Sequence, residues 1–216
     1  MPSSKQDRRL NVGVLGCGPI AQFAHLESCQ KARNVELYAM CDVAADLLER
    51  MAGYYRPQRT YLSYQEMLAD PKLDAVVIAT SDGFHVPASL QALAAGKHVL
   101  CEKPLGVSVE EVEELAAAVK RQGKILQVGH MKRFDPGLEA ARDFVRDEMG
   151  EILALKAWYC DSTHRYTMTD AVQPVPIASA QARKPGENPK ADLRRYFMLA
   201  HGSHLVDTAR FLCGDL

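Results

Sequence analysis

The four residues Cys101-Glu102-Lys103-Pro104 place a thiol, an acid and an amine directly at the end of an apolar stretch. The proline disfavours helical geometry at Lys103, so its side chain is expected to project from a strand end into a cleft. A lysine among partly desolvated groups can have a lowered pKa and can work as a general acid or base. Glu102 could hold its ammonium in place. The same residues also allow an ordinary exposed lysine in a surface ion pair.

A glycine turn lies near the start of the chain, where Gly16-Cys-Gly18-Pro-Ile-Ala21 follows the apolar run Val12–Leu15. Gly16 would allow a tight turn, Gly18 would let the backbone approach phosphate oxygens, and Ala21 would let a helix lie against the strand. The positive end of that helix and its free N–H groups favour an anion. The spacing predicts a pyrophosphate cradle, although a glycine turn without a ligand has the same letters.

Two further positions are expected beside this cradle. Asp42 lies 21 residues after Ala21, where it could accept hydrogen bonds from the adenosine ribose and repel a 2′-phosphate. Val43 follows it instead of an arginine, which favours NAD over NADP; the alternative is a solvated helix-cap aspartate. In Thr80-Ser-Asp-Gly-Phe-His85, small polar residues could contact the pyrophosphate and the second ribose, or form a turn with an N-cap.

The elements that must position these residues alternate between strands and helices. The predicted strands are Leu10–Gly16, Val35–Cys41, Arg59–Tyr61, Leu73–Thr80, His98–Cys101 and Ile125–Gly129. The predicted helices are Pro19–Arg33, Ala44–Gly53, Ser63–Ala69, Val86–Ala95 and Ser108–Gln122. Capping-box spacing at Ser63 and at Ser108 marks the start of two of these helices. This alternation predicts an α/β fold, a Rossmann-type doubly wound parallel sheet that binds ligands at the carboxyl ends of its strands.

The pattern changes after residue 130, so we expect a Rossmann domain over residues 1–130 and an incomplete α+β C-terminal domain over 131–216. There the sequence predicts a helix over Pro136–Met149, one strand over Ile152–Asp161, a long loop over 162–192 and a helix over Leu205–Leu212. An isolated strand would leave its backbone groups unpaired.

Composition narrows the class of protein. The 26 Lys and Arg against 27 Asp and Glu are mixed along the chain, which argues against nucleic acid or an anionic membrane as a partner. The polar N-terminus has no apolar segment typical of a signal peptide, and no run approaches a membrane span. The six cysteines form no Cys-x-x-Cys pair, so we expect no metal site and buried free thiols in a reducing cytoplasm.

The motifs Gly16–Ala21 and Glu102-Lys-Pro104 are followed, in this order, by His201-Gly-Ser-His204-Leu-Val-Asp207. Together they resemble the Gfo/Idh/MocA family of NAD(P)-dependent oxidoreductases, which includes glucose-fructose oxidoreductase and inositol dehydrogenases. Arg133-Phe-Asp-Pro136 adds to the resemblance. It implies that Lys103 lies near the nicotinamide and the reacting hydroxyl, and that His204 lies across the substrate as a proton-transfer group.

Two departures from the family pattern qualify this expectation. Ala200 stands where the family commonly has an aspartate, four residues before His204, so catalysis would use Lys103 and His204 or be altered or lost. Ser81-Asp82 stands where the family usually has Pro-Asn, while His85 matches. Family members also carry a large, mostly antiparallel C-terminal sheet, of which only one strand is visible here, so the sequence is expected to be C-terminally truncated.

The resemblance implies hydride transfer between nicotinamide and a secondary alcohol of a sugar, inositol or related polyol. The alternatives are a non-catalytic NAD-binding regulator and an enzyme that uses transient oxidation for elimination or epimerisation. A homo-oligomer is expected if the C-terminal sheet is present. The candidate catalytic residues are Lys103 and His204. The candidate cofactor contacts are Gly16, Gly18, Pro19, Ile20, Ala21, Asp42, Thr80, His85, Glu102 and Lys103. Residues that could line the substrate pocket, or lie on an ordinary surface, are Arg133, His164, Arg165, Lys190, Arg194, Arg195 and Tyr196.

Overall fold

The computed structural model of the chain describes residues 8–160, 175–182 and 191–214. It divides into two compact units, which are treated separately. Unit 1 comprises Met1–Val128 and Pro176–Gly186; unit 2 comprises Gly129–Val175 and Glu187–Leu216. The described helices contain no segment long and apolar enough to span a membrane.

Unit 1 is built on a parallel sheet of six strands in the order β3-β2-β1-β4-β5-β6. The strands are β1 (Leu10–Leu15), β2 (Val35–Cys41), β3 (Arg59–Tyr61), β4 (Ala75–Ile78), β5 (His98–Cys101) and β6 (Leu126–Val128). Strand order reverses direction at β1, with β2 on one side and β4 on the other. The predicted Rossmann-type sheet is therefore confirmed, and its carboxyl ends near β1 and β4 form the expected ligand edge.

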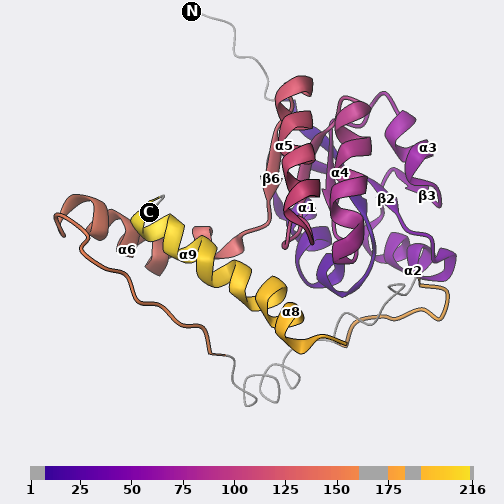
Figure 1. Cartoon of the computed structure of the whole chain (residues 1–216). Coiled ribbons are helices and arrows are strands. Elements are labelled where there is room, and N and C mark those ends of the chain that lie inside the picture. The colour runs from indigo at the N-terminus through magenta and orange to yellow at the C-terminus, as the bar shows by residue number, and fades with distance from the viewer. Residues whose placement is uncertain (1–7, 161–174, 183–190, 215–216) are drawn as a thin grey trace, which may run out of the picture. The chain divides into compact units, whose positions relative to one another are not determined.

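Helices connect successive strands, as parallel pairing requires. They are the π-helical turn η1 (Ala21–His25) with α1 (Leu26–Lys31), α2 (Ala45–Tyr55), α3 (Tyr64–Ala69), the 3-10 turn η2 (Asp82–Phe84) with α4 (His85–Ala94), and α5 (Val109–Gln122). Figure 1 shows α4 and α5 side by side along one face of the sheet, where they also contact each other.

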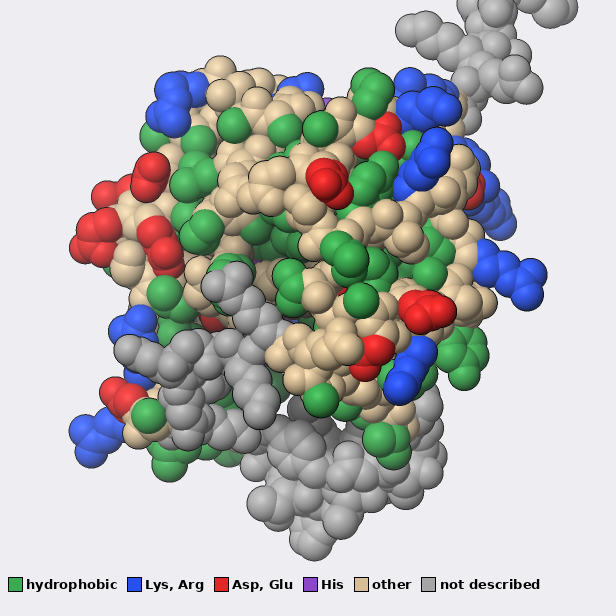
Figure 2. All heavy atoms as spheres, turned by 90° about the vertical axis from the view of Figure 1, so that its right-hand side faces the viewer, with side chains coloured by type: hydrophobic (Ala, Val, Ile, Leu, Met, Phe, Trp, Pro, Cys, Tyr) green, Lys and Arg blue, Asp and Glu red, His purple; other side chains and the backbone are tan. Residues whose placement is uncertain are grey.

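Two apolar clusters, one on each face of the sheet, hold unit 1 together. Alternation along β4 sends Val76 and Ile78 into one cluster with α4 and α5, and Val77 into the other with α1 and α2. Burial on both faces explains the continuous apolar run in this strand. Figure 2 shows basic and acidic side chains interspersed with apolar and neutral ones on one face of the molecule, in keeping with the balanced charge.

Short sequence patterns predicted the ends of several strands and helices correctly. The strands Val35–Cys41, Arg59–Tyr61 and His98–Cys101 have the predicted bounds. Ser63 accepts a hydrogen bond from the Glu66 N–H, and Ser108 forms a complete capping box with Glu111. At the far end of α5, Gly123 has the left-handed conformation (φ 58°) typical of a helix C-terminus.

The end of α2 was predicted wrongly. Gly53 lies inside the helix, which continues to Tyr55 and ends at Arg56 with φ 49°. Tyr55 packs on the same apolar cluster as the buried Met51, and this packing outweighs the cost of about 1 kcal/mol for a glycine inside a helix.

Unit 2 contains η3 (Met131–Phe134), α6 (Pro136–Asp147), α8 (Leu193–Phe197), the π-helical turn η4 (Met198–Gly202) and α9 (Ser203–Cys213). The strand predicted over Ile152–Asp161 was wrong: residues 152–160 belong to no strand or helix, and Asp161 lies outside the described residues. An extended segment becomes a strand only when another strand takes its N–H and C=O groups, and no described part of unit 2 does so. Most of the predicted loop over 162–192 also lies outside the described residues.

Candidate cofactor and catalytic site

The glycine turn after β1 is held between the two neighbouring strands. The Gly16 N–H donates to the carbonyl of Cys41 at 2.8 Å, and Gly16 has φ 93°. A Cβ at Gly16 would lie 2.7 Å from the carbonyl oxygen of Ala79, so only glycine fits. A Cβ at Gly18, by contrast, would have no neighbouring atom within 4 Å. The turn thus presents an open backbone surface at Gly18, which fits the close approach of a phosphate.

The helix after the turn begins with Pro19, whose missing N–H and restricted φ suit a first helical position. The Gln22 N–H donates to the Gly18 carbonyl at 3.1 Å. Ala21 is fully buried in the cluster with Val14, whereas Ile20 is 39% exposed. The small residue therefore lets the helix pack against β1, and Ile20 faces outward beside the turn.

Asp42 ties the glycine turn to the next helix. One carboxylate oxygen accepts from the Cys17 N–H at 2.7 Å and the other from the Ala44 N–H at 2.8 Å. Asp42 therefore joins the glycine turn to Ala44, the N-cap residue of α2, and its contact with a ribose stays a prediction. Burial, together with the Asp42 charge, raises the pKa of the Cys17 thiol, so the thiol stays neutral in the turn.

His85 joins the loops that follow β4 and β5. Its ring is 1% exposed; Nε2 lies 3.1 Å from the Thr80 carbonyl and Nδ1 lies 2.6 Å from the Pro104 carbonyl. The predicted direct contact of His85 with a cofactor therefore does not suit its position. The side chain instead holds Thr80, itself half-buried, and Pro104 in a fixed relation at the carboxyl edge of the sheet.

Both carboxylate oxygens of Glu102 make hydrogen-bond contacts at this edge. Its Oε1 lies 2.8 Å from Nε2 of His25, and its Oε2 accepts from the Lys103 N–H at 3.1 Å. Burial raises the pKa of Glu102, but the hydrogen bond and charge of His25 and the contacts with Lys103 outweigh it and hold that pKa below its ordinary value. Glu102 thus binds the backbone of Lys103 as a half-buried carboxylate.

In unit 2, His201 and His204 form a group of stacked rings with Tyr159 and Phe197. The Tyr159 ring stacks on His201 and His204, with ring centroids 5.4 Å and 6.4 Å apart. Phe197 also stacks on His201, and Lys132 Nζ lies 5.5 Å from the Tyr159 ring centroid. His204 therefore lies against the Tyr159 ring, with Ala200 four residues before it in the chain.

Asp207 forms a bidentate ion pair with Arg133 in unit 2. Arg133 donates to it from Nε at 2.9 Å and from an NH2 group at 2.6 Å, and Asp207 is only 9% exposed. This bidentate contact attaches α9 to η3. The sequence leaves Arg133 as either a pocket-lining or an ordinary surface residue. In the structure it binds Asp207 in α9, the helix that carries His204.

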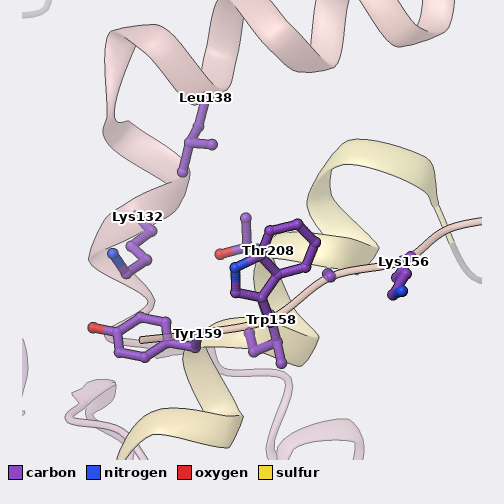
Figure 3. Close-up of a pocket in the computed structure, with 8 residues that line it drawn as sticks. Lys132, Leu138, Lys156, Trp158, Tyr159 and Thr208 are labelled. Atoms are coloured by element: carbon purple, nitrogen blue, oxygen red, sulfur yellow. The ribbon is translucent and has the colours of Figure 1, made fainter. Parts of the chain in front are cut away.

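A hollow of about 380 Å³ lies between α6, α9 and the segment 156–159 (Figure 3). Lys132, Leu138, Trp158, Tyr159 and Thr208 line it, and Figure 3 shows the Trp158 ring beside Thr208. Trp158 is 73% exposed, so the hollow is an open apolar surface with lysines at its margin.

Sequence reasoning missed His25 and Gln22. The Gln22 side chain donates to the Ile177 carbonyl at 2.9 Å and accepts from the Ile177 N–H at 2.8 Å, which attaches the segment 175–182 to the first helix of unit 1. No local pattern marks these long-range contacts, because Ile177 lies far from Gln22 in the chain and Glu102 lies far from His25. Their place in the helix that follows the glycine turn was the one available signal.

Residues 10–130 match the family described as an oxidoreductase family with an NAD-binding Rossmann fold, GFO_IDH_MocA. The chain belongs to this family. Its members include an inositol 2-dehydrogenase/D-chiro-inositol 3-dehydrogenase from Shouchella clausii, 34% identical over 169 residues that cover 76% of this chain and 49% of the relative. A trans-1,2-dihydrobenzene-1,2-diol dehydrogenase from Mus musculus is 34% identical over 164 residues, which cover 74% of this chain and 49% of the relative.

Among solved structures, an NAD binding oxidoreductase from Klebsiella pneumoniae is similar, with a TM-score of 0.78 and 26% identity. The similarity covers 95% of this chain and 54% of that one. This chain spans about half the length of the relatives it matches in the Gfo/Idh/MocA family. The match to the family model takes in the glycine turn, Asp42, the Thr80 loop and Glu102-Lys103, all in unit 1.

Proposed function

We propose that this chain supplies the NAD-binding unit, and part of the substrate side, of an oxidoreductase that acts on a secondary alcohol of a sugar, inositol or related polyol. The observation that carries the proposal is the open glycine turn at Gly18 beside Asp42, at the same sheet edge as Glu102-Lys103. The dehydrogenases of inositols and of a diol among its relatives support the polyol class.

The cofactor would be held mainly by unit 1. Gly18 leaves room for the pyrophosphate, and the N-terminus of the helix at Pro19, Ile20 and Ala21 favours its negative charge. Asp42 would accept hydrogen bonds from the adenosine ribose and disfavour a 2′-phosphate, which is why NAD is proposed in preference to NADP. Thr80 would contact the nicotinamide side, with His85 acting only through the loop that it holds.

When bound, the nicotinamide supplies the hydride chemistry. Lys103 would take the proton of the substrate hydroxyl as a general base, and Glu102 would hold its backbone in place. His204 would be the second proton-transfer group, as the family resemblance implies. Its stacking on Tyr159 leaves a defined ring orientation for that role.

The test combines cofactor binding with turnover. NADH and NADPH are titrated by fluorescence, and reduction of NAD is followed with myo-inositol, scyllo-inositol and a set of sugars. We expect NADH to bind more tightly than NADPH, and Asp42→Ala to reduce this preference at least about 10-fold, since a charged hydrogen bond is worth about 1.5–3 kcal/mol. Lys103→Ala should keep NADH binding and lose at least about 100-fold in kcat. Full activity of Lys103→Ala would contradict the proposed role.

A second candidate is a non-catalytic NAD-binding protein, which Ala200 favours because it replaces the aspartate expected beside the histidine. The same titration separates the two. Tight NADH binding without turnover of any polyol, and without gain of turnover in Ala200→Asp, would support the binding protein. Turnover that increases in Ala200→Asp would support an enzyme with a weakened catalytic set.

A further inference from the structure

His25 and Glu102 form a pair that joins the first helix of unit 1 to the end of β5. They are 77 residues apart, and His25 Nε2 lies 2.8 Å from Glu102 Oε1. Their side chains are 13% and 15% exposed, so solvent contributes little to holding either one. His25 ends the π-helical turn η1, in which the Leu26 N–H donates to the carbonyl of Ala21. Such widened turns are frequent at functional sites.

Glu102 connects His25 to the backbone of Lys103. Its own N–H donates to the Ile78 carbonyl at 3.0 Å, which fixes its backbone to β4. Its second carboxylate oxygen accepts from the Lys103 N–H at 3.1 Å. The carboxylate therefore bridges a helix and the backbone of Lys103, and its direction is set by the group that binds Oε1.

A second histidine, His85, holds the backbone that follows Lys103. The Pro104 carbonyl lies 2.6 Å from Nδ1 of His85, and Pro104 is buried. Histidine contacts therefore fix the backbone on both sides of Lys103. His25 acts at the Lys103 N–H through Glu102, and His85 contacts the Pro104 carbonyl. A proton-transfer group needs such support, because small displacements of a reacting group cost large factors in rate.

We propose that His25 is a positioning residue for Lys103, acting through the Glu102 carboxylate. The inference rests on the proposed function for the role of Lys103, but the contact itself exists without cofactor or substrate. His25 orients the carboxylate, the carboxylate fixes the Lys103 N–H, and the amine keeps its place at the edge where β4 and β5 end. His25 does not touch the reacting atoms.

The first experiment measures the contact in the protein alone. Lysine-selective 15N labelling gives the backbone amide signal of Lys103, and its hydrogen exchange is followed in wild type and in His25→Phe, which keeps a ring of similar size but has no donor. We expect the Lys103 amide proton to shift and to exchange at least about 10-fold faster in His25→Phe. His25→Gln, which keeps a donor, should restore most of the wild-type behaviour. His98→Gln, at a half-buried histidine of β5, is the control and should leave this signal unchanged.

The second experiment measures turnover. With the polyol that reacts best, His25→Phe should lower kcat about 10- to 100-fold while the Kd for NADH changes less than about 3-fold, in the range observed for supporting residues around a site. If His25→Phe does not fold, Glu102→Gln is used, and the same amide shift and kcat loss are expected. An unchanged Lys103 amide signal in the folded variant overturns the inference, and so does an equal loss in His25→Gln and His25→Phe. Absence of NADH binding or turnover in wild type, with the amide response intact, would overturn the proposed function and not the contact.

Discussion

Alanine should lower stability when it replaces Gly16 in the turn after β1, but should lower only NADH affinity when it replaces Gly18. In Gly16→Ala the new Cβ must adopt φ 93°, at a cost of about 1–2 kcal/mol for a left-handed backbone. It also lies 2.7 Å from the Ala79 carbonyl oxygen, a backbone atom at the end of β4 that cannot rotate away, which adds about 1–3 kcal/mol of overpacking. Alanine restricts the unfolded chain and returns about 0.4–1 kcal/mol. The expected net loss is about 1–5 kcal/mol.

Gly18→Ala provides the matched control. Its Cβ would meet no atom within 4 Å, so the free energy of unfolding should stay within about 0.5 kcal/mol of wild type. The methyl group would, however, occupy the surface to which a phosphate is proposed to bind. NADH affinity should therefore fall at least about 10-fold, or about 1.4 kcal/mol.

The assay is urea unfolding followed by far-UV circular dichroism, combined with NADH fluorescence titration. Gly16→Ala should lower the urea midpoint without changing the slope, since the surface exposed on unfolding is the same. If Gly16→Ala is as stable as wild type, the close approach of the turn to Ala79 is wrong. If Gly18→Ala binds NADH normally, the cradle does not hold the cofactor.

Three further substitutions test the rest of the structure. Arg133→Met should speed amide hydrogen exchange in α9 about 10-fold or more, because it leaves the buried Asp207 carboxylate without its bidentate partner; unchanged exchange would show that α9 is attached by other contacts. Ser108→Ala should cost about 1 kcal/mol by removing the capping box of α5, while Ser28→Ala on the exposed side of α1 should cost less than about 0.5 kcal/mol. Burial, with a smaller contribution from Asp42, raises the pKa of Cys41 from 9.0 to about 12. Its contribution to stability is therefore complete below pH 9 and is lost as the pH rises toward 12, by up to about 4 kcal/mol. Cys41→Ala should make the fall in urea midpoint between pH 9 and 11 shallower, and an unchanged slope would contradict the burial argument.

Local pattern predicted unit 1 well because its signals are short-range. Alternation of apolar runs with capped helices was enough for a parallel sheet, and Ser63, Ser108 and Gly123 act through groups three or four residues away. The same reasoning failed at Gly53, where packing of Tyr55 on the core extends the helix past the expected glycine stop. It failed again over residues 152–160, because strand formation depends on a partner strand and not on the segment's own composition.

The candidate site divides in the same way. Gly16, Gly18, Asp42 and Glu102-Lys103 could be placed at one edge from sequence alone, because all of them follow strands of a parallel sheet, whose carboxyl ends must meet there. The pairing of His25 with Glu102, 77 residues away, and of Arg133 with Asp207, 74 residues away, was decided only by the tertiary structure. A hydrogen bond depends on a separation of about 3 Å in space, and no spacing along the chain encodes that distance once the two partners lie on different elements.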